Sequence, residues 1–204
     1  MNVLDSLSKS IQHATELSIS GERKAVLNAL IDYIQSGVKS GKEVNLNFIC
    51  THNSRRSQFS QIWAQVAAYY YGVEINSFSG GVEVTEFNPR AVASVTRFGF
   101  KVEKDGDVNP RYAVRYSEDA QPLLCFSKTF DDPSNPKENF AAVMTCSHAD
   151  ENCPFIAGAE ARIPVRYDDP KMFDDTDAES SKYDERSLQI AAEMFYVFSR
   201  VSAP

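Results

Sequence analysis

The chain has 204 residues, of which 43% are hydrophobic, and this composition favours a folded protein with a buried core over a disordered chain. Its formal net charge is -7, from 21 basic and 28 acidic residues, and no run of Lys or Arg offers the concentrated positive charge that nucleic acids bind. No stretch approaches the roughly 20 apolar residues that span a bilayer, and residues 1–10 lack the apolar run of a signal peptide. We therefore expect a cytoplasmic protein that binds neither nucleic acid nor membrane.

The first 40 residues have the apolar spacing of helices. Apolar side chains recur on one helical face over residues 4–11 and again over residues 27–34. Gly37 and Gly41 are expected to end the second helix. We predict an N-terminal helical extension over residues 1–40.

A strand, a polar loop and a helix are predicted next. Residues 44–49 alternate in polarity and are rich in β-forming residues, which predicts a strand that runs into Cys50. Apolar residues then recur at helical spacing over residues 59–70. Residues 73–78 predict a second strand and residues 89–98 a further helix, so this part of the chain begins as βαβα.

Residues 104–137 interrupt this alternation. Residues 112–116 and 123–130 resemble strands, and a turn-rich segment with two prolines follows them. We predict a β-hairpin insertion at about residues 104–137, within one α/β domain that covers residues 41–204.

The last third of the chain returns to alternating elements. Strands are predicted at residues 140–145 and 162–167, and a final amphipathic helix at residues 188–198. Strands that alternate with helices favour a doubly wound sheet, whose ligands bind beyond the carboxyl ends of the strands. Three chemically reactive side chains would lie at that edge: Cys50, Cys146 and Asp169.

The predicted loop after the first strand has features of an oxyanion site. Cys50 and Arg56 stand six positions apart, between the strand and the helix. Backbone N–H groups at such a helix start bind tetrahedral anions, and Arg56 adds two parallel hydrogen bonds. The same field favours a thiolate at Cys50, placed to attack the bound anion. The alternative is a merely buried Cys50, with Arg55 and Arg56 solvated on the first helical turn.

Residues 50–57, Cys-Thr-His-Asn-Ser-Arg-Arg-Ser, resemble the Cys-x5-Arg-Ser loop of low-molecular-weight protein tyrosine phosphatases and of the thioredoxin-coupled arsenate reductases that share their fold. The resemblance implies a flavodoxin-like, three-layer α/β fold with a four-stranded parallel sheet. It implies Cys50 as nucleophile, Arg56 as oxyanion clamp, Asn53 as loop organiser and Ser57 as a hydroxyl donor to the thiolate.

This loop also departs from the family pattern at two positions. His52 stands where the family usually has Gly, and Arg55 where it often has Cys. The oxyanion-binding set that the resemblance implies is Thr51, His52, Asn53, Ser54, Arg55, Arg56 and Ser57.

Two further cysteines, Cys146 and Cys153, lie in a polar segment that is expected to be a loop. Such a pair suits a relay in which each thiolate attacks the sulfur before it. The sequence from Cys146 to Pro154 is similar to the Cys-Ser-x-Ala-Asp-x-Asn-Cys-Pro segment of thioredoxin-coupled arsenate reductases, with His148 at a position that is commonly acidic. Two alternatives stay open: inert burial, and a zinc site built from Cys146, His148, Asp150 and Cys153. Cys125 is expected to be a small buried hydrophobe.

Asp169 is the candidate general acid. Both families carry a late Asp-Pro pair whose Asp protonates the leaving group, and Asp169-Pro170 follows the last predicted strand. Asp168 is expected to be structural or solvent-facing. Taken alone, Asp-Asp-Pro is also an ordinary turn, and the same tripeptide occurs at residues 131–133.

The leading interpretation is reduction of arsenate to arsenite through Cys50, Cys146 and Cys153, with an external dithiol such as thioredoxin as reductant. It requires no metal and no organic cofactor. One alternative is a phosphatase that hydrolyses phosphotyrosine or a small phosphoester through a phosphocysteine. A further alternative is a silent oxyanion-binding module that uses residues 1–40 as a partner surface.

Overall fold

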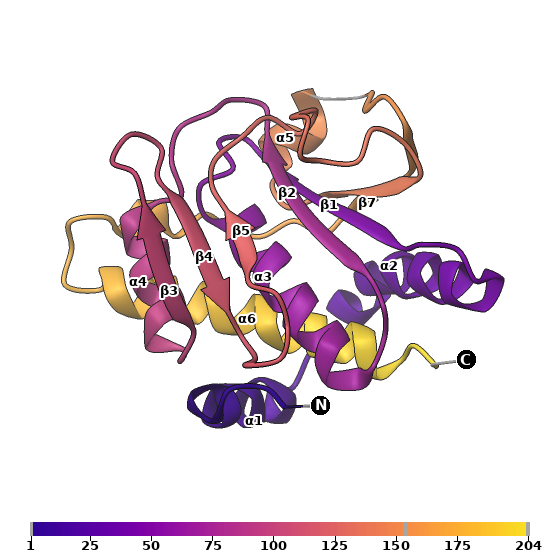
Figure 1. The fold of residues 1–204 in the computed structure, drawn as a ribbon, viewed down its shortest axis with the longest axis horizontal. Helices are drawn as coiled ribbons and strands as arrows, with labels where there is room; N and C mark the ends of the chain where they lie inside the picture. The colour runs from indigo at the N-terminus through magenta and orange to yellow at the C-terminus, as the bar shows by residue number, and fades with distance from the viewer. Residues whose placement is uncertain (1, 153–154, 203–204) are drawn as a thin grey trace.

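Four parallel strands form the central sheet in the computed structural model, which describes residues 2–152 and 155–202. They lie in the order β2-β1-β6-β7, and Figure 1 labels three of them, β2, β1 and β7. Their bounds are Asn45–Cys50 for β1, Asn76–Gly81 for β2, Phe140–Met144 for β6 and Ala159–Pro164 for β7. Because all four run in one direction, their carboxyl ends share one edge of the sheet. The predicted four-stranded parallel sheet and flavodoxin-like α/β fold are confirmed.

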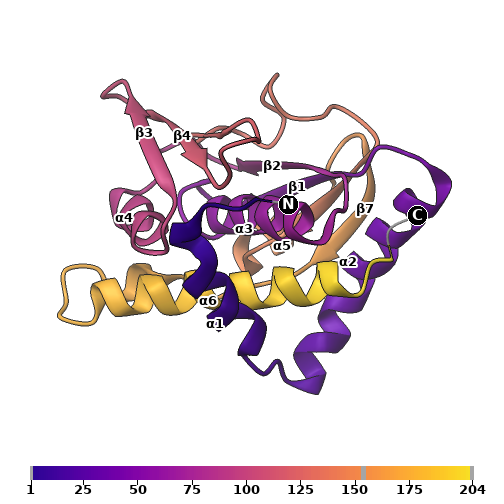
Figure 2. The same ribbon diagram turned by 60° about the horizontal axis from the view of Figure 1, so that its bottom comes forward.

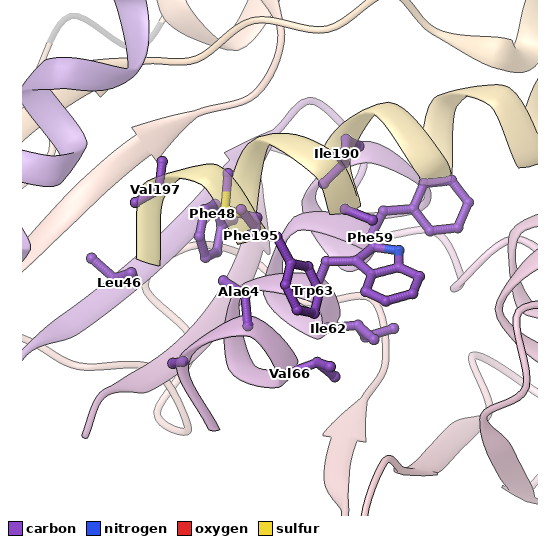
Figure 3. Close-up of a cluster of buried hydrophobic side chains, with 14 of the residues drawn as sticks. Leu46, Phe48, Phe59, Ile62, Trp63, Ala64, Val66, Ile190, Phe195 and Val197 are labelled. Atoms are coloured by element: carbon purple, nitrogen blue, oxygen red, sulfur yellow. The ribbon is translucent and has the colours of Figure 1, made fainter. Parts of the chain in front are cut away.

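One face of this sheet packs against two long helices, α3 (Arg56–Tyr71) and α6 (Glu179–Ser199). Figure 3 shows Trp63 of α3 lying close to α6 in this core. Its ring meets that of Phe195 edge to face, and its Nε1 donates a 2.9 Å hydrogen bond to Ser187 Oγ. Burial of these side chains stabilises the packing of α3 against α6.

The N-terminal helices are present where the sequence predicts helices. A 3₁₀ turn (Asp5–Leu7) leads into α1 (Ser8–Glu16), and α2 follows (Gly21–Ser40); both helices pack against α6 (Figure 2). Gly41 ends α2 at φ 65°, as expected.

The expectation that Gly37 also ends α2 is wrong, because this residue lies within the helix. A Cβ at Gly37 would stand 2.5 Å from Cγ2 of Val44, so glycine there lets the chain entering β1 pack against α2. Among the described residues, no helix is both long enough and apolar enough to cross a membrane.

A second, smaller sheet precedes β6 in the chain. Helix α4 (Pro89–Arg97) leads into three antiparallel strands: β3 (Lys101–Asp105), β4 (Arg111–Arg115) and β5 (Leu123–Cys125). The predicted hairpin is present as β4 and β5, and β3 adds a third strand that the sequence analysis missed. The reason is that β3 reads Lys-Val-Glu-Lys-Asp and is largely exposed, so it has almost no apolar alternation.

The segment that follows β5 and leads back to the central sheet is hydrogen-bonded to the end of β2. The backbone N–H of Gly81 donates a 2.8 Å hydrogen bond to the carbonyl of Lys128, and that of Phe130 donates a 2.9 Å bond to the carbonyl of Gly81. The segment after β5 is thereby fixed beside the carboxyl end of β2, where the candidate site lies.

The other face of the central sheet carries a smaller buried cluster. Its members come from β1, β6 and the residues that follow β6: Ile49, Cys50, Phe140, Ala142, Met144, Cys146, Ala149 and Ile156. A short helix, α5 (Ser147–Asn152), follows β6 on this side. Two of the four cysteines therefore lie in one buried cluster at the carboxyl edge of the sheet.

Candidate active site

The loop between β1 and α3 is organised by Asn53. This residue has φ 47°, a left-handed conformation that Asn tolerates better than most residues. Its Nδ2 donates a 2.8 Å hydrogen bond to Ser57 Oγ, and its Oδ1 accepts a 3.0 Å bond from the backbone N–H of Lys128. Gln58 Nε2 donates to the Asn53 carbonyl at 3.0 Å. One side chain thus connects the loop, the start of α3 and the segment after β5.

The Cys50 sulfur lies at the base of this loop. The Cys50 residue is 3% exposed, and its Sγ lies 3.1 Å from Ser57 Oγ. Since Asn53 already donates to Ser57 Oγ, the hydroxyl proton of Ser57 is free to point at the sulfur. When Cys50 is a thiolate, this hydroxyl must be the donor, and the hydrogen bond stabilises the negative charge.

The backbone amides of the loop are available to an anion. Within the described part of the chain, the N–H groups of residues 52 to 58 donate no hydrogen bond. The last three of these residues form the first turn of α3, a helix of 16 residues whose N-terminal end carries partial positive charge. The loop therefore presents a run of unpaired donors to a tetrahedral oxyanion.

Arg56 and Asp169 are brought together by the fold. Arg56 donates through one terminal nitrogen to Asp169 Oδ2 at 2.8 Å and through the other to the Tyr167 carbonyl at 3.0 Å. Its buried Nε has no hydrogen-bond partner within the described residues. Asp169 also caps the 3₁₀ turn η2 (Pro170–Phe173), where its Oδ1 accepts from the Lys171 N–H at 3.1 Å. A guanidinium donor and a carboxyl group thus lie together in the structure.

Asp168 occupies a different environment from its neighbour. Its side chain is 93% exposed and lies 3.5 Å from the guanidinium of Arg186. This agrees with the expectation that Asp168 faces solvent.

The guanidinium of Arg55 is surrounded by Tyr183, Asp174 and Asp169. Its Nε donates a 2.8 Å hydrogen bond to the Tyr183 hydroxyl, and a terminal nitrogen lies 3.8 Å from Asp174. Burial, together with the hydrogen bond to Asp174, raises the pKa of Tyr183 to about 12. Its other terminal nitrogen lies 3.9 Å from Asp169 Oδ1, so Arg55, which the sequence analysis placed among the oxyanion-binding residues, lies beside the same carboxylate as Arg56.

Two residues of the loop, His52 and Ser54, contact the segments that follow β2 and β5. The His52 carbonyl accepts a 2.8 Å hydrogen bond from Ser127 Oγ, and His52 Nε2 lies 3.4 Å from Glu83. Ser54 Oγ donates to the Glu86 carbonyl at 2.7 Å. The side chains of both residues thus contact residues that follow β2. Their backbone N–H groups donate no hydrogen bond within the described residues.

Cys146 lies beside this loop. It is 1% exposed, and its Sγ lies 3.5 Å from Thr51 Oγ1, one residue after Cys50. The Ala149 backbone N–H donates to the same sulfur at 3.4 Å. Cys153, the other predicted relay thiol, lies outside the described residues.

The segment after Cys146 is not the polar loop that the sequence analysis expected, because residues 147–152 form α5. The buried carboxylate of Asp150 is held at 2.7 Å by Arg166 Nε and at 2.7 Å by Arg162. These two arginines come from β7 and the residues just after it. The pairing of Asp150 with them therefore could not be predicted from residues 146–154 alone.

Cys125 is isolated from this chemistry. It is fully buried, and desolvation raises the pKa of its thiol to about 12, as expected for an inert hydrophobe. Among the described residues, no group of three or more His, Cys, Asp or Glu side chains is arranged to hold a metal ion.

The sequence analysis did not recognise that Gly81 lies against the loop. A Cβ on Gly81 would stand 2.7 Å from the backbone N of Asn53 and 2.8 Å from the carbonyl of Thr51. The absence of a side chain is therefore what allows the loop to lie against the end of β2. In the sequence, the Gly80-Gly81 pair at the end of β2 was the feature that could have indicated this close approach.

Comparisons with known proteins find similar sequences and folds, although no family model matches the chain. The chain is 31% identical over 123 residues to arsenate reductase 2 of Staphylococcus saprophyticus, which covers 60% of this chain and 76% of that protein. It is 27% identical over 132 residues to an arsenate reductase of Halalkalibacterium halodurans, covering 65% and 78% respectively. Its fold is similar to that of a low-molecular-weight phosphotyrosine phosphatase from Vibrio cholerae, with TM-score 0.50, 13% identity and coverage of 76% and 94%.

Proposed function

Because this chain belongs to the family of arsenate reductases that share the low-molecular-weight protein tyrosine phosphatase fold, we propose that it reduces arsenate to arsenite through a relay of three cysteine thiols. The relay consists of Cys50, Cys146 and Cys153. The observation that carries the proposal is the position of Cys146, whose sulfur lies 3.5 Å from a side chain of the Cys50 loop. A phosphatase needs one cysteine at this edge of the sheet, whereas a reductase needs a second thiol within reach of the first.

The first step uses the loop and its charged partners. The arsenate oxygens accept hydrogen bonds from the unpaired N–H groups of residues 52 to 58 and from Arg56, whose guanidinium exchanges the Asp169 carboxylate for the substrate. The Cys50 thiolate then attacks arsenic. Asp169, released from Arg56 and protonated, gives its proton to a hydroxyl group of the arsenate as the As–O bond breaks, so that this group leaves as water.

The second step transfers electrons from sulfur to arsenic. The Cys146 thiolate attacks the Cys50 sulfur, and the electron pair of the S–As bond stays on arsenic, which leaves as arsenite while a Cys50–Cys146 disulfide forms. Cys153 then attacks Cys146 and releases the Cys50 thiolate. An external dithiol such as thioredoxin reduces the resulting Cys146–Cys153 disulfide, so the proposed cycle has no step on a metal or organic cofactor.

A second candidate function is phosphatase activity on phosphotyrosine or a small phosphoester. It is supported by two contacts, that of Cys50 with Ser57 and that of Arg56, the residue before Ser57, with Asp169. A nucleophilic thiol, a guanidinium and a carboxyl group suffice to form a phosphocysteine and to protonate an alkoxide or phenolate. Water would then hydrolyse the phosphocysteine, and neither Cys146 nor Cys153 would take part.

Two assays on one set of variants distinguish the functions. Arsenate-dependent NADPH oxidation is measured with thioredoxin and thioredoxin reductase, and hydrolysis of para-nitrophenyl phosphate is measured in parallel. Cys50→Ser should abolish both activities, whereas Cys146→Ser and Cys153→Ser should abolish only arsenate reduction. Cys125→Ala is the matched control, because Cys125 is a fully buried cysteine outside the relay, and its variant should retain both activities. Arsenate turnover that survives Cys153→Ser would refute the three-thiol relay.

A further inference from the structure

A hydroxyl group of the loop connects the Cys146 thiol to an imidazole. Thr51 Oγ1 lies 3.5 Å from Cys146 Sγ and 3.3 Å from His148 Nδ1. Thr51 and Cys146 are buried, whereas His148 is exposed. The three side chains therefore form a short path for a proton from a buried sulfur to a side chain in contact with solvent.

The proposed reaction requires a base at this position. A thiolate, and not a thiol, attacks a sulfur, so Cys146 must lose its proton before it reacts with Cys50. Because only 1% of the Cys146 residue is exposed, its thiol has little direct access to water as a proton acceptor. The backbone N–H of Ala149, 3.4 Å from the same sulfur, stabilises the thiolate once it has formed but accepts no proton.

The Thr51 hydroxyl has the chemistry of a proton carrier. A hydroxyl donates one hydrogen bond while it accepts others, so Thr51 accepts from the Cys146 S–H and donates to Nδ1 of neutral His148. After transfer the directions reverse, and the imidazolium N–H donates to Thr51 while Thr51 donates to the thiolate. Both arrangements use the same heavy-atom distances, so no side chain has to move.

We infer that His148 is a positioning residue that accepts the Cys146 proton through Thr51 and so prepares Cys146 to attack Cys50. This inference deepens the proposed arsenate reduction and rests on it. In the transfer, the Cys146 S–H bond breaks and its electron pair stays on sulfur. Thr51 receives one proton and passes another to His148. The exposed imidazolium returns that proton to solvent.

The acidic residues of α5 are engaged with arginines. Asp150 is paired with Arg162 and Arg166, and Glu151 lies 4.0 Å from Arg166. His52, the other histidine of the loop region, lies against Glu83. His148 is thus the imidazole that shares a hydrogen-bonding group with the Cys146 sulfur.

The test isolates the step in which Cys146 acts. In a Cys153→Ser background, the reduced protein is mixed with arsenate without thioredoxin and quenched with iodoacetamide, and the Cys50–Cys146 disulfide is followed by mass spectrometry. His148→Gln keeps a hydrogen-bonding side chain but removes the proton acceptor, and should slow disulfide formation by about tenfold or more. His148→Asp restores an acceptor and should retain a rate within about threefold of the parent. Imidazole added to His148→Ala should restore part of the lost rate.

Phosphate binding serves as the control for this experiment. Measured by calorimetry, this binding should be equal in the parent and in the uncharged variants His148→Gln and His148→Ala, because the loop amides and Arg56 are unchanged. Disulfide formation in His148→Gln at the parental rate would overturn the inference and leave the relay intact, as would a loss in His148→Ala that imidazole fails to restore. A Cys153→Ser parent that forms no disulfide with arsenate would instead refute the proposed function itself.

Discussion

The guanidinium of Arg56 donates a 2.8 Å hydrogen bond to the carboxylate of Asp169, a residue 113 positions further along the chain. The pair joins the residue that is expected to hold an oxyanion to the residue that is expected to supply a proton. An incoming oxyanion must compete with Asp169 for Arg56, and the same competition releases the carboxyl group for catalysis. Substrate binding and activation of the acid are thereby coupled in the proposed mechanism.

This coupling predicts opposite effects of Asp169→Asn on binding and on turnover. The variant should bind phosphate more tightly, because the competing carboxylate of the Arg56 pair is gone. Its kcat for para-nitrophenyl phosphate or arsenate should fall by about 10² to 10⁴, the typical contribution of a general acid. Calorimetry and steady-state kinetics measure the two effects. Asp168→Asn is the control, because that side chain is 93% exposed, and it should alter neither quantity; an equal fall in kcat would contradict the assignment of Asp169.

Substitutions of Asn53 should separate backbone strain from lost hydrogen bonds. Both Asn53→Gly and Asn53→Ala remove the bonds to Ser57 and Lys128, each of which contributes about 0.5 to 1.5 kcal/mol. Alanine should cost about 1 kcal/mol more than glycine, because the residue sits at φ 47°. Urea denaturation measures both losses of stability. Equal stability of the two variants would mean that the left-handed backbone is not retained.

Gly81→Ala should damage the anion site from outside the loop. The added methyl group would lie 2.7 Å from the Asn53 backbone nitrogen and 2.8 Å from the Thr51 carbonyl, so the loop must shift at a cost of about 1 to 3 kcal/mol. Phosphate affinity should fall together with thermal stability. Gly21→Ala is the matched control, since a Cβ there meets nothing within 4 Å, and it should leave phosphate binding intact.

The buried thiol of Cys125 should resist alkylation at pH 8. Burial raises its pKa to about 12, so at pH 8 the thiolate that iodoacetamide requires is scarcely populated in the folded protein. Above an unfolded pKa of about 8.5, the same shift lowers the free energy of unfolding, because only the unfolded state readily loses the proton. Peptide mapping should find Cys125 unmodified in native protein and modified in urea. Rapid modification of the native protein would contradict its burial.

Local pattern in the sequence was sufficient to predict most of the helices and strands. Apolar alternation and helical spacing depend only on near neighbours, so the strand into Cys50, the helix after it and the helices of residues 1–40 were predictable. The edge of a parallel sheet then placed Cys50 and Cys146 together without knowledge of any side-chain contact.

Only the tertiary structure decided how side chains from distant segments are oriented. Nothing near Arg55 in sequence indicates that it turns toward Tyr183, 128 residues away, and nothing near Thr51 indicates that its hydroxyl meets both Cys146 and His148. The exposed strand β3 and the helix α5 were missed for a related reason, since partner strands and distant arginines hold them in place. Such contacts depend on register and packing between elements, and a local sequence pattern carries no record of either.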